Sequence, residues 1–206
     1  MALADLPLRD LLAGFSSSDP TPGGGSASAL ASAVGASLLM MVARLPKTRT
    51  GAEGERTELA AASAALDAIR ARLTSAIDAD AGAYDQVVAA YKLPKGTPDE
   101  QASRKAAIQQ ALRAATDVPL EVMRLSAAAI EHGKTVAANG HRAAASDVGV
   151  AAALLAAGLR GAALNIEINA GSVADQAYVA RVRAESTQLS EDAGRQAGET
   201  EALLRG

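Results

Sequence analysis

The chain has 206 residues, of which 20 are Lys or Arg and 23 are Asp or Glu, so its formal net charge is −3. Without a basic excess no nucleic-acid partner is expected, and the lack of cysteine excludes disulfides and thiolate metal sites. Hydrophobic residues make up 49% of the chain but aromatic residues only 2%, because alanine dominates. A core of such small side chains favours closely packed helices over a sheet.

The first residues carry acidic side chains and Pro7 where a signal peptide needs a basic start and an apolar run, which predicts a cytoplasmic protein. An amphipathic helix is expected from Asp5 to Ala13, ended by Gly14. The stretch from Pro20 to Ala43 is uncharged and long enough to cross a membrane. Its glycines, prolines and serines favour a buried core helix instead, so no membrane partner is expected.

The segment Thr21-Pro22-Gly23-Gly24-Gly25-Ser26 leads into this helix and has the composition of a ligand cradle. Glycines adopt backbone angles closed to other residues, and free amides at a helix N-terminus attract anions. A plain turn is the alternative interpretation. We take Pro22, Gly23, Gly24, Gly25 and Ser26 as candidate substrate-binding residues.

A long helix is expected from Glu55 to about Tyr91, where apolar residues recur at helical spacing until Lys92–Gly96 breaks the pattern. The next helix has a well-defined start. Thr97 is followed three residues later by Glu100, with a proline at the first helical position, which is the pattern of a capping box.

That second long helix is predicted to kink or restart near Pro119 and to end at Gly133, with one further turn up to Gly140. Ser146 and Asp147 are predicted to cap a second charge-poor helix over 148–169, and a last helix begins at 172–175. No segment has the pattern of a strand. The chain is therefore predicted to be one all-α domain over residues 1–206, a bundle in which two small-residue-rich helices are buried among long amphipathic ones.

Asp80 lies on the apolar stripe of the first long helix, between Ile77 and Tyr84. A carboxylate on an apolar face costs several kcal/mol unless it is paired or protonated, so it is often kept for a function. A structural Asp bonded to a neighbouring helix end or to an Arg fits the position equally well. Asp78 lies about 200° away around the helix and on geometry alone is expected in solvent.

Two other pairs of polar residues are candidates for binding. Asn165 and Asn169 are one turn apart on the second charge-poor helix, where two amides suit the edge of an amide-like heterocycle or simply bond a neighbouring helix. Lys92 and Lys95 follow the helix that carries Asp80. They are either solvated or in contact with an acidic part of a substrate.

Asp147 fits either a site or a helix cap. His132 and His141 are the only histidines, and their spacing is not that of metal ligands, so no metal site is expected.

Six segments, taken together and in order, resemble the cyclodeaminase/cyclohydrolase family of one-carbon folate enzymes. They are Thr21–Ser26, Asp78–Ala81 with Tyr84, Tyr91–Lys95, Val118–Leu120, Ser146–Ala152 and Leu164–Asn169. The resemblance implies an all-helical homodimer that binds a tetrahydrofolate derivative as substrate and needs no further cofactor. It also implies a catalytic carboxylate at Asp78 or Asp80, of which the apolar stripe favours Asp80.

The same resemblance makes Tyr84, Ser146 and Asp147 candidates for substrate binding. The chain departs from the family at two places. Gly140 is followed by His141 where the family often has asparagine, and the loop Leu45–Arg49 differs from the usual one. His141 is kept as a candidate, and substrate details are expected to differ if these positions contact the pterin or the glutamate.

The predicted reaction is hydrolysis of 5,10-methenyltetrahydrofolate to 10-formyltetrahydrofolate, with Asp80 as general base and electrostatic partner of the substrate cation. Lys92 or Lys95 would bind the glutamate or assist protonation at nitrogen. Cyclodeamination of 5-formiminotetrahydrofolate is the alternative, disfavoured because the chain lacks a transferase domain. A non-enzymatic helical interaction module is a third hypothesis, against which the inward Asp80 and the glycine segment argue.

Overall fold

The computed structural model describes residues 1–205, and their regular structure is helical, which confirms the all-α prediction. The 3-10 helices are η1 (Leu3–Asp5) and η2 (Arg142–Ala144). The α-helices are α1 (Leu8–Phe15), α2 (Gly24–Ala43), α3 (Glu53–Tyr91), α4 (Pro98–Asn139), α5 (Ala145–Ala170) and α6 (Gln176–Arg205). In this part of the chain the one pairing of strand type is an isolated bridge between Thr48 and Gly140.

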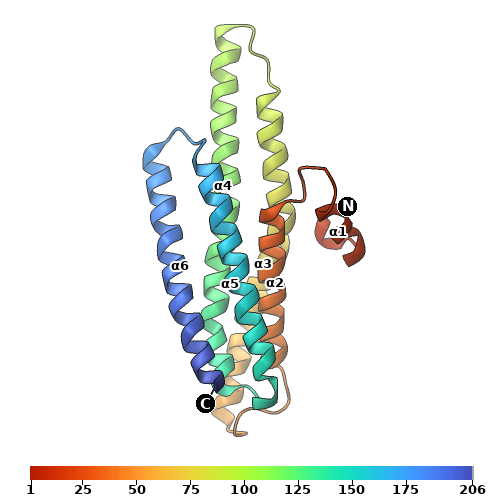
Figure 1. Ribbon diagram of the computed structural model, residues 1–206, viewed down its shortest axis with the longest axis vertical. Coiled ribbons are helices and arrows are strands. Elements are labelled where there is room, and N and C mark those ends of the chain that lie inside the picture. The colour runs from red at the N-terminus through yellow and green to blue at the C-terminus, as the bar shows by residue number, and fades with distance from the viewer. Residues whose placement is uncertain (206) are drawn as a thin grey trace.

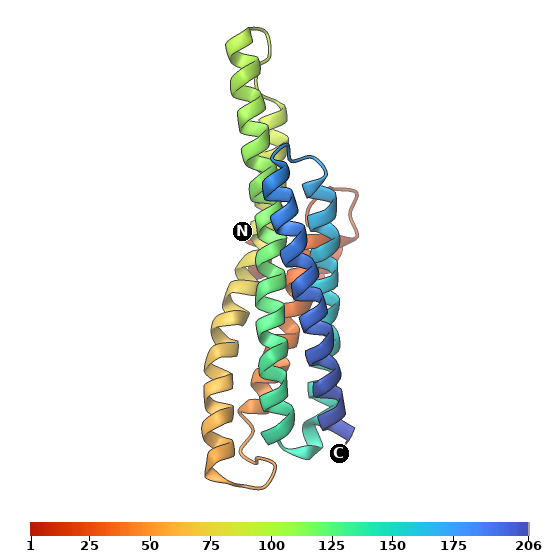
Figure 2. The same cartoon turned by 90° about the vertical axis from the view of Figure 1, so that its left-hand side faces the viewer.

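Helices α2 to α6 lie side by side along one long axis, and the hairpin of α3 and α4 extends well beyond the ends of the other helices (Figures 1 and 2). Helix α1 lies apart, beside α2 and α3 (Figure 1). Helix α2 packs mainly on α5 and α3, and α4 packs on α3, α5 and α6. The largest fully buried side chains in these contacts are Leu39, Leu66, Leu73, Met123, Ile130, Leu155 and Ile166.

Small residues bring α2 and α5 close together, as the alanine-rich composition predicts. A Cβ added at Gly158 of α5 would lie 2.6 Å from the carbonyl oxygen of Ser28 and 2.0 Å from Oγ of Ser32. The two backbones are therefore in direct contact, which leaves no room for a side chain at this crossing.

Helix α4 runs without a break from Pro98 to Asn139, so the predicted restart near Pro119 and the end at Gly133 are wrong. Gly133 lies inside the helix, where an added Cβ would meet Leu39 and Thr200 at the ordinary contact distance of 3.8 Å. The capping box is confirmed, because Thr97 accepts a hydrogen bond from the backbone N–H of Glu100, and Glu100 accepts from that of Thr97.

Two other predicted helix starts are also wrong. Pro7 separates η1 from α1, so the expected single helix from Asp5 to Ala13 is divided. Helix α5 begins at Ala145, directly after η2, and no side chain caps it. Ser146 and Asp147 consequently lie within its first turn and do not act as its cap.

The two charge-poor helices pack at the centre of the bundle, but one side of each remains exposed. We call this side the α2–α5 apolar surface and define it by the exposed residues Val34, Met41, Val150, Leu164 and Ile168. By length and composition, 24–43 and 142–170 would both suffice to cross a membrane, yet 56% and 39% of their most apolar windows are buried. Core helices of soluble proteins have the same composition, so this finding is weak evidence for a membrane span.

Candidate active site

A cleft of about 260 Å³ lies where the N-terminal end of α2 meets α3, α4 and the C-terminal end of α5. Its wall consists of Pro20, Thr21, Gly23, Gly24, Gly25, Asp80, Tyr84, Val87, Leu112, Ala115, Asn165 and Asn169. A larger hollow of about 560 Å³ lies between α3 and α4, but its wall is mainly apolar. The smaller cleft is the candidate active site because it brings together a half-buried carboxylate, two amide side chains and a helix N-terminus.

Asp80 is held against the first turn of α2, on the inward side that the stripe of α3 predicts. Its Oδ2 accepts a hydrogen bond of 2.8 Å from the backbone N–H of Ser26. The hydroxyl Oγ of Ser26 lies 3.0 Å from the same oxygen and 2.8 Å from the carbonyl oxygen of Ile77. A hydroxyl has one hydrogen to donate, so it serves one of these acceptors at a time.

Burial raises the pKa of Asp80 above its ordinary value of 3.8, against the opposing effect of the two contacts with Ser26. When Ser26 donates its hydroxyl hydrogen to Ile77, the short contact between Ser26 Oγ and Asp80 Oδ2 suits a protonated carboxyl. While Oδ2 is fixed by Ser26, Oδ1 receives no hydrogen bond from residues 1–205 and is available to a ligand. The group thus combines a fixed position with a free oxygen, as a general base requires.

The glycine segment differs from the predicted cradle. Gly24, Gly25 and Ser26 form the first turn of α2, and Gly23 is its N-cap with an extended backbone. Among the described residues only Gly51 has a positive φ, so the expectation of unusual backbone angles in this segment is wrong. Gly25 is required for a different reason, because a Cβ there would lie 2.0 Å from Oδ1 of Asp80.

The backbone N–H groups of Gly24 and Gly25 have no acceptor in the part of the chain that the structure describes, as expected for the first residues of a helix. They lie at the positive end of α2, both residues line the cleft, and Gly25 adjoins the free oxygen of Asp80. The cleft therefore offers a carboxylate and two unused donors side by side.

The two asparagines reach the cleft from the last turns of α5. Asn165 donates from Nδ2 to the carbonyl oxygen of Gly161 at 2.9 Å, within its own helix. Asn169 donates from Nδ2 to the carbonyl oxygen of Ala115 in α4 at 2.7 Å. The structure thus brings the predicted amide pair to the same cleft as Asp80, and Asn169 makes the interhelical bond that was the alternative interpretation.

Asp78 does not face the cleft. Its carboxylate accepts hydrogen bonds from the backbone N–H groups of Leu3 and Ala4, so it holds η1 against α3. The expectation that Asp78 is merely solvated is therefore wrong, and the geometry gives it an N-terminal anchoring contact.

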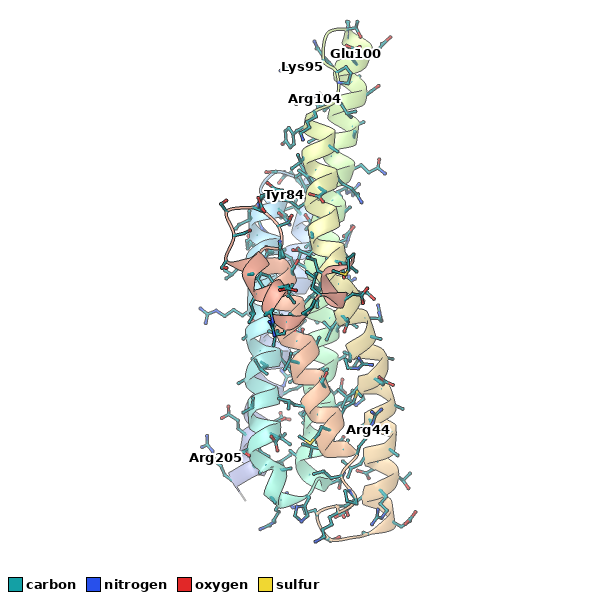
Figure 3. All side chains as sticks on the ribbon, turned by 90° about the vertical axis from the view of Figure 1, so that its right-hand side faces the viewer. Arg44, Tyr84, Lys95, Glu100, Arg104 and Arg205 are labelled. Atoms are coloured by element: carbon teal, nitrogen blue, oxygen red, sulfur yellow. The ribbon has the colours of Figure 1, made fainter. Side chains whose placement is uncertain are left out.

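Lys92 and Lys95 are exposed at the tip of the α3–α4 hairpin. Lys92 is twelve residues beyond Asp80, or about 18 Å along α3. Figure 3 shows Tyr84 near the N-terminal end of α2 and Lys95 far above it at the hairpin tip. In one chain, only Tyr84 of these three residues lines the cleft.

His141, Ser146 and Asp147 lie at the opposite end of the bundle, near the C-terminal end of α2, about 30 Å from its first turn. His141 lines a separate cavity together with Arg49. The two departures from the family pattern thus lie at one place, away from Asp80. No described contact connects these three residues to the cleft, and their role in substrate binding stays a prediction.

Sequence reasoning missed the part of the wall that α4 supplies, namely Leu112 and Ala115. An apolar side chain in a helix has no chemical signature. The one available signal was Pro119, because a proline inside a helix leaves the carbonyl oxygen four residues earlier without its partner.

Comparisons with known proteins give consistent matches. A family model described as formiminotransferase-cyclodeaminase matches residues 7–188. The chain is 40% identical over 187 residues to a methenyltetrahydrofolate cyclohydrolase from Methylorubrum extorquens, covering 91% of this chain and 90% of that protein. It is 36% identical to the formimidoyltransferase-cyclodeaminase of Sus scrofa over 95% of its own length, but spans only 36% of that longer protein.

The fold matches a crystal structure of formiminotetrahydrofolate cyclodeaminase from Thermotoga maritima with a TM-score of 0.87 and 25% sequence identity. The match covers 98% of this chain and 97% of that chain. The same helical fold therefore occurs in a protein of similar size.

Proposed function

This chain belongs to the formiminotransferase-cyclodeaminase family, and on this premise we propose that it hydrolyses 5,10-methenyltetrahydrofolate to 10-formyltetrahydrofolate in one-carbon folate metabolism. The match to a methenyltetrahydrofolate cyclohydrolase over nearly the whole of both chains supports this choice of reaction. The observation that carries it is Asp80, half-buried, fixed through one oxygen and free at the other.

In the proposed mechanism Asp80 acts on the delocalised N5–C–N10 cation of the substrate. The carboxylate stabilises this positive charge and accepts a proton from the water that attacks the central carbon. The C–N5 bond then breaks as Asp80 returns its proton to N5 and the hydroxyl group of the adduct loses its remaining proton to solvent, which leaves the formyl group on N10. The N–H groups of Gly24 and Gly25 are placed to bind an oxygen that gains negative charge in these steps.

We assign the remaining candidate binding residues to different parts of the folate molecule. Gly23 lines the cleft at the start of α2, where Pro22 precedes it in the chain, and Tyr84 follows one turn after Asp80 on α3. Lys92 and Lys95 lie on the same hairpin beyond Tyr84, where their charge suits the glutamate carboxylates. At about 18 Å from Asp80 along α3, Lys92 is too distant to protonate a substrate nitrogen in its own cleft. We therefore assign Lys92 to binding of the glutamate part of the folate and not to the chemical step.

Cyclodeamination of 5-formiminotetrahydrofolate is the second candidate, and the Thermotoga maritima match favours it. That protein is a formiminotetrahydrofolate cyclodeaminase, and the match covers 97% of its chain. A chain of this length is therefore compatible with either reaction, and length does not discriminate between them.

Purified protein should accelerate the loss of 5,10-methenyltetrahydrofolate absorbance above the spontaneous rate, and release no ammonia from 5-formiminotetrahydrofolate. The two substrates are tested separately, with heat-denatured protein as the control. Ammonia release without accelerated hydrolysis would reverse the order of the two candidates, and neither reaction nor folate binding would leave the helical interaction module as the function.

We infer further that the protein is a cytoplasmic homodimer and that its subunits associate through the α2–α5 apolar surface. The support is the size of the exposed side chains on that surface, with Leu164 exposed by 62% and Ile168 by 76%. Apolar surface of this kind is stabilised when a second copy removes it from water.

Replacing Leu164 and Ile168 together by glutamate should therefore convert a dimer into a monomer, measured by light scattering after size-exclusion chromatography. The helical circular dichroism should be retained, because both side chains point away from the core. Leu203→Glu, an exposed leucine of α6, is the matched control and should leave the dimer intact. A wild-type protein that is monomeric at micromolar concentration would contradict the proposal.

A further inference from the structure

Pro119 creates a local defect in α4 that coincides with the wall of the cleft. In an α-helix the carbonyl oxygen of residue i accepts from the N–H of residue i+4, and proline has no N–H to give. The carbonyl oxygen of Ala115 therefore has no partner within α4. An unpaired backbone carbonyl is unfavourable in a partly buried place, so another donor is needed.

That donor comes from the neighbouring helix. Nδ2 of Asn169 in α5 lies 2.7 Å from the carbonyl oxygen of Ala115. Since a carbonyl oxygen can only accept, it must face the NH₂ side of the asparagine amide. The contact thus fixes which way round the amide lies and directs its Oδ1 away from Ala115.

As a result, the α5 side of the cleft carries hydrogen-bond acceptors. Asn169 and Ala115 both line it, and neither Oδ1 of Asn169 nor Oδ1 of Asn165 receives a hydrogen bond from residues 1–205. Asn165 also commits its NH₂ side elsewhere, to Gly161. The two amides are one turn apart on α5, so they present two acceptor oxygens on one face.

We propose that Pro119 and Asn169 form a positioning pair for the substrate: the proline frees the Ala115 carbonyl, which orients Asn169 so that its Oδ1 accepts from the N–H donors of the pterin ring. A pterin carries such donors at N3 and at its 2-amino group, next to each other on one edge. This inference rests on the proposed folate substrate. Asn169 contacts the substrate, whereas Pro119 acts only through Asn169.

A double-mutant cycle tests the pair, with KM, kcat and melting temperature measured for each protein in the methenyltetrahydrofolate assay. Asn169→Ala should raise KM about tenfold, the effect of losing one hydrogen bond, and should lower the melting temperature because Ala115 loses its partner. Pro119→Ala gives α4 its missing N–H. It should preserve the melting temperature and still raise KM, because the Asn169 amide is no longer held.

The combined Pro119→Ala, Asn169→Ala protein separates binding from structure. It should recover the melting temperature of Pro119→Ala while KM stays raised. If KM instead returns to the wild-type value, Asn169 only supports the helix and the proposal is overturned. A wild-type KM in the Pro119→Ala protein would likewise remove Pro119 from the pair.

A substrate analogue in which the 2-amino group is replaced by methyl adds a readout that a structural role would not change. Wild-type protein should prefer the natural substrate over this analogue about tenfold in kcat/KM, and Asn169→Ala should lose that preference. Asn139→Ala, an asparagine at the other end of α4, is the control and should keep it. Unchanged discrimination in Asn169→Ala would overturn the inference alone, whereas a wild-type protein inactive on both folates would overturn the proposed function.

Discussion

The Asp80→Asn protein is expected to lose at least about a hundredfold in kcat and to keep its fold. An asparagine has the size of an aspartate and can still accept the hydrogen bond from the Ser26 N–H, so the start of α2 is preserved. It carries no negative charge and takes no proton at neutral pH. The loss would therefore report the chemical role of the carboxylate and not a change of structure.

The melting temperature gives an independent check on this variant. The pKa of Asp80 is raised in the folded protein, so ionised Asp80 is less favourable there than in the unfolded chain. Stability from this group is fully present below pH 3.8 and is lost as the pH rises through the folded pKa. At pH 7 the Asp80→Asn protein should therefore unfold at the same temperature as the wild type or higher.

The pH dependence of kcat completes the test. The wild-type rate should fall as the pH drops through the raised pKa of Asp80, since a protonated carboxyl accepts no proton. The residual rate of Asp80→Asn should lack this acid limb. Asp85→Asn, an exposed carboxylate on the same helix, is the control and should behave as the wild type. Near-normal turnover in Asp80→Asn would remove Asp80 from the mechanism.

Gly25→Ala is expected to be as damaging as the loss of the carboxylate itself, with at least about a hundredfold lower kcat. The new methyl group would lie 2.0 Å from Oδ1 and 2.4 Å from Cγ of Asp80, so the carboxylate has to leave its place at α2. Alanine is the better helix former by about 1 kcal/mol, so any loss arises from this clash and not from helix propensity.

Gly24→Ala adds the same methyl group one residue earlier, where the nearest atom is Nδ2 of Asn165 at 3.6 Å. Its effect on kcat should be at least about tenfold smaller, because this is an ordinary contact distance.

The Gly25→Ala protein should also melt at a lower temperature, and adding Asp80→Ala should restore the melting temperature without restoring turnover. Wild-type kcat in Gly25→Ala would show that Asp80 works from another position.

How far the fold follows from the sequence depends on whether the decisive contact is local. The start of α4 is encoded within four residues, Thr97 to Glu100, and was predicted correctly. The continuity of α4 through Pro119 was not, because the missing hydrogen bond is compensated by Asn169, fifty residues later in the chain. The local sequence pattern reveals the proline, but it does not reveal the hydrogen-bond donor Asn169, which is distant in the sequence.

In the candidate site, too, features set by local sequence were predictable and features set by distant contacts were not. The inward position of Asp80 follows from the periodicity of α3 alone, since the apolar stripe fixes which side of the helix faces the bundle. The reason for Gly25 could not be predicted, because it depends on how closely α3 approaches α2. Asp78 was misjudged for a similar reason, as its partners Leu3 and Ala4 belong to a short N-terminal segment that the pattern did not separate.

The carboxylate proposed as the base is also the group that completes α2. Gly23 has no side chain to cap this helix, and Asp80 supplies the missing acceptor from α3. Proton uptake by Asp80 and order in the first turn of α2 are therefore linked equilibria, each of which shifts the other by the same free energy. Because the Ser26 contacts favour the ionised carboxylate, protonated Asp80 holds this turn less firmly. In the proposed mechanism that state lasts only from the attack of water to the protonation of N5, so the first turn of α2 is anchored again before product leaves.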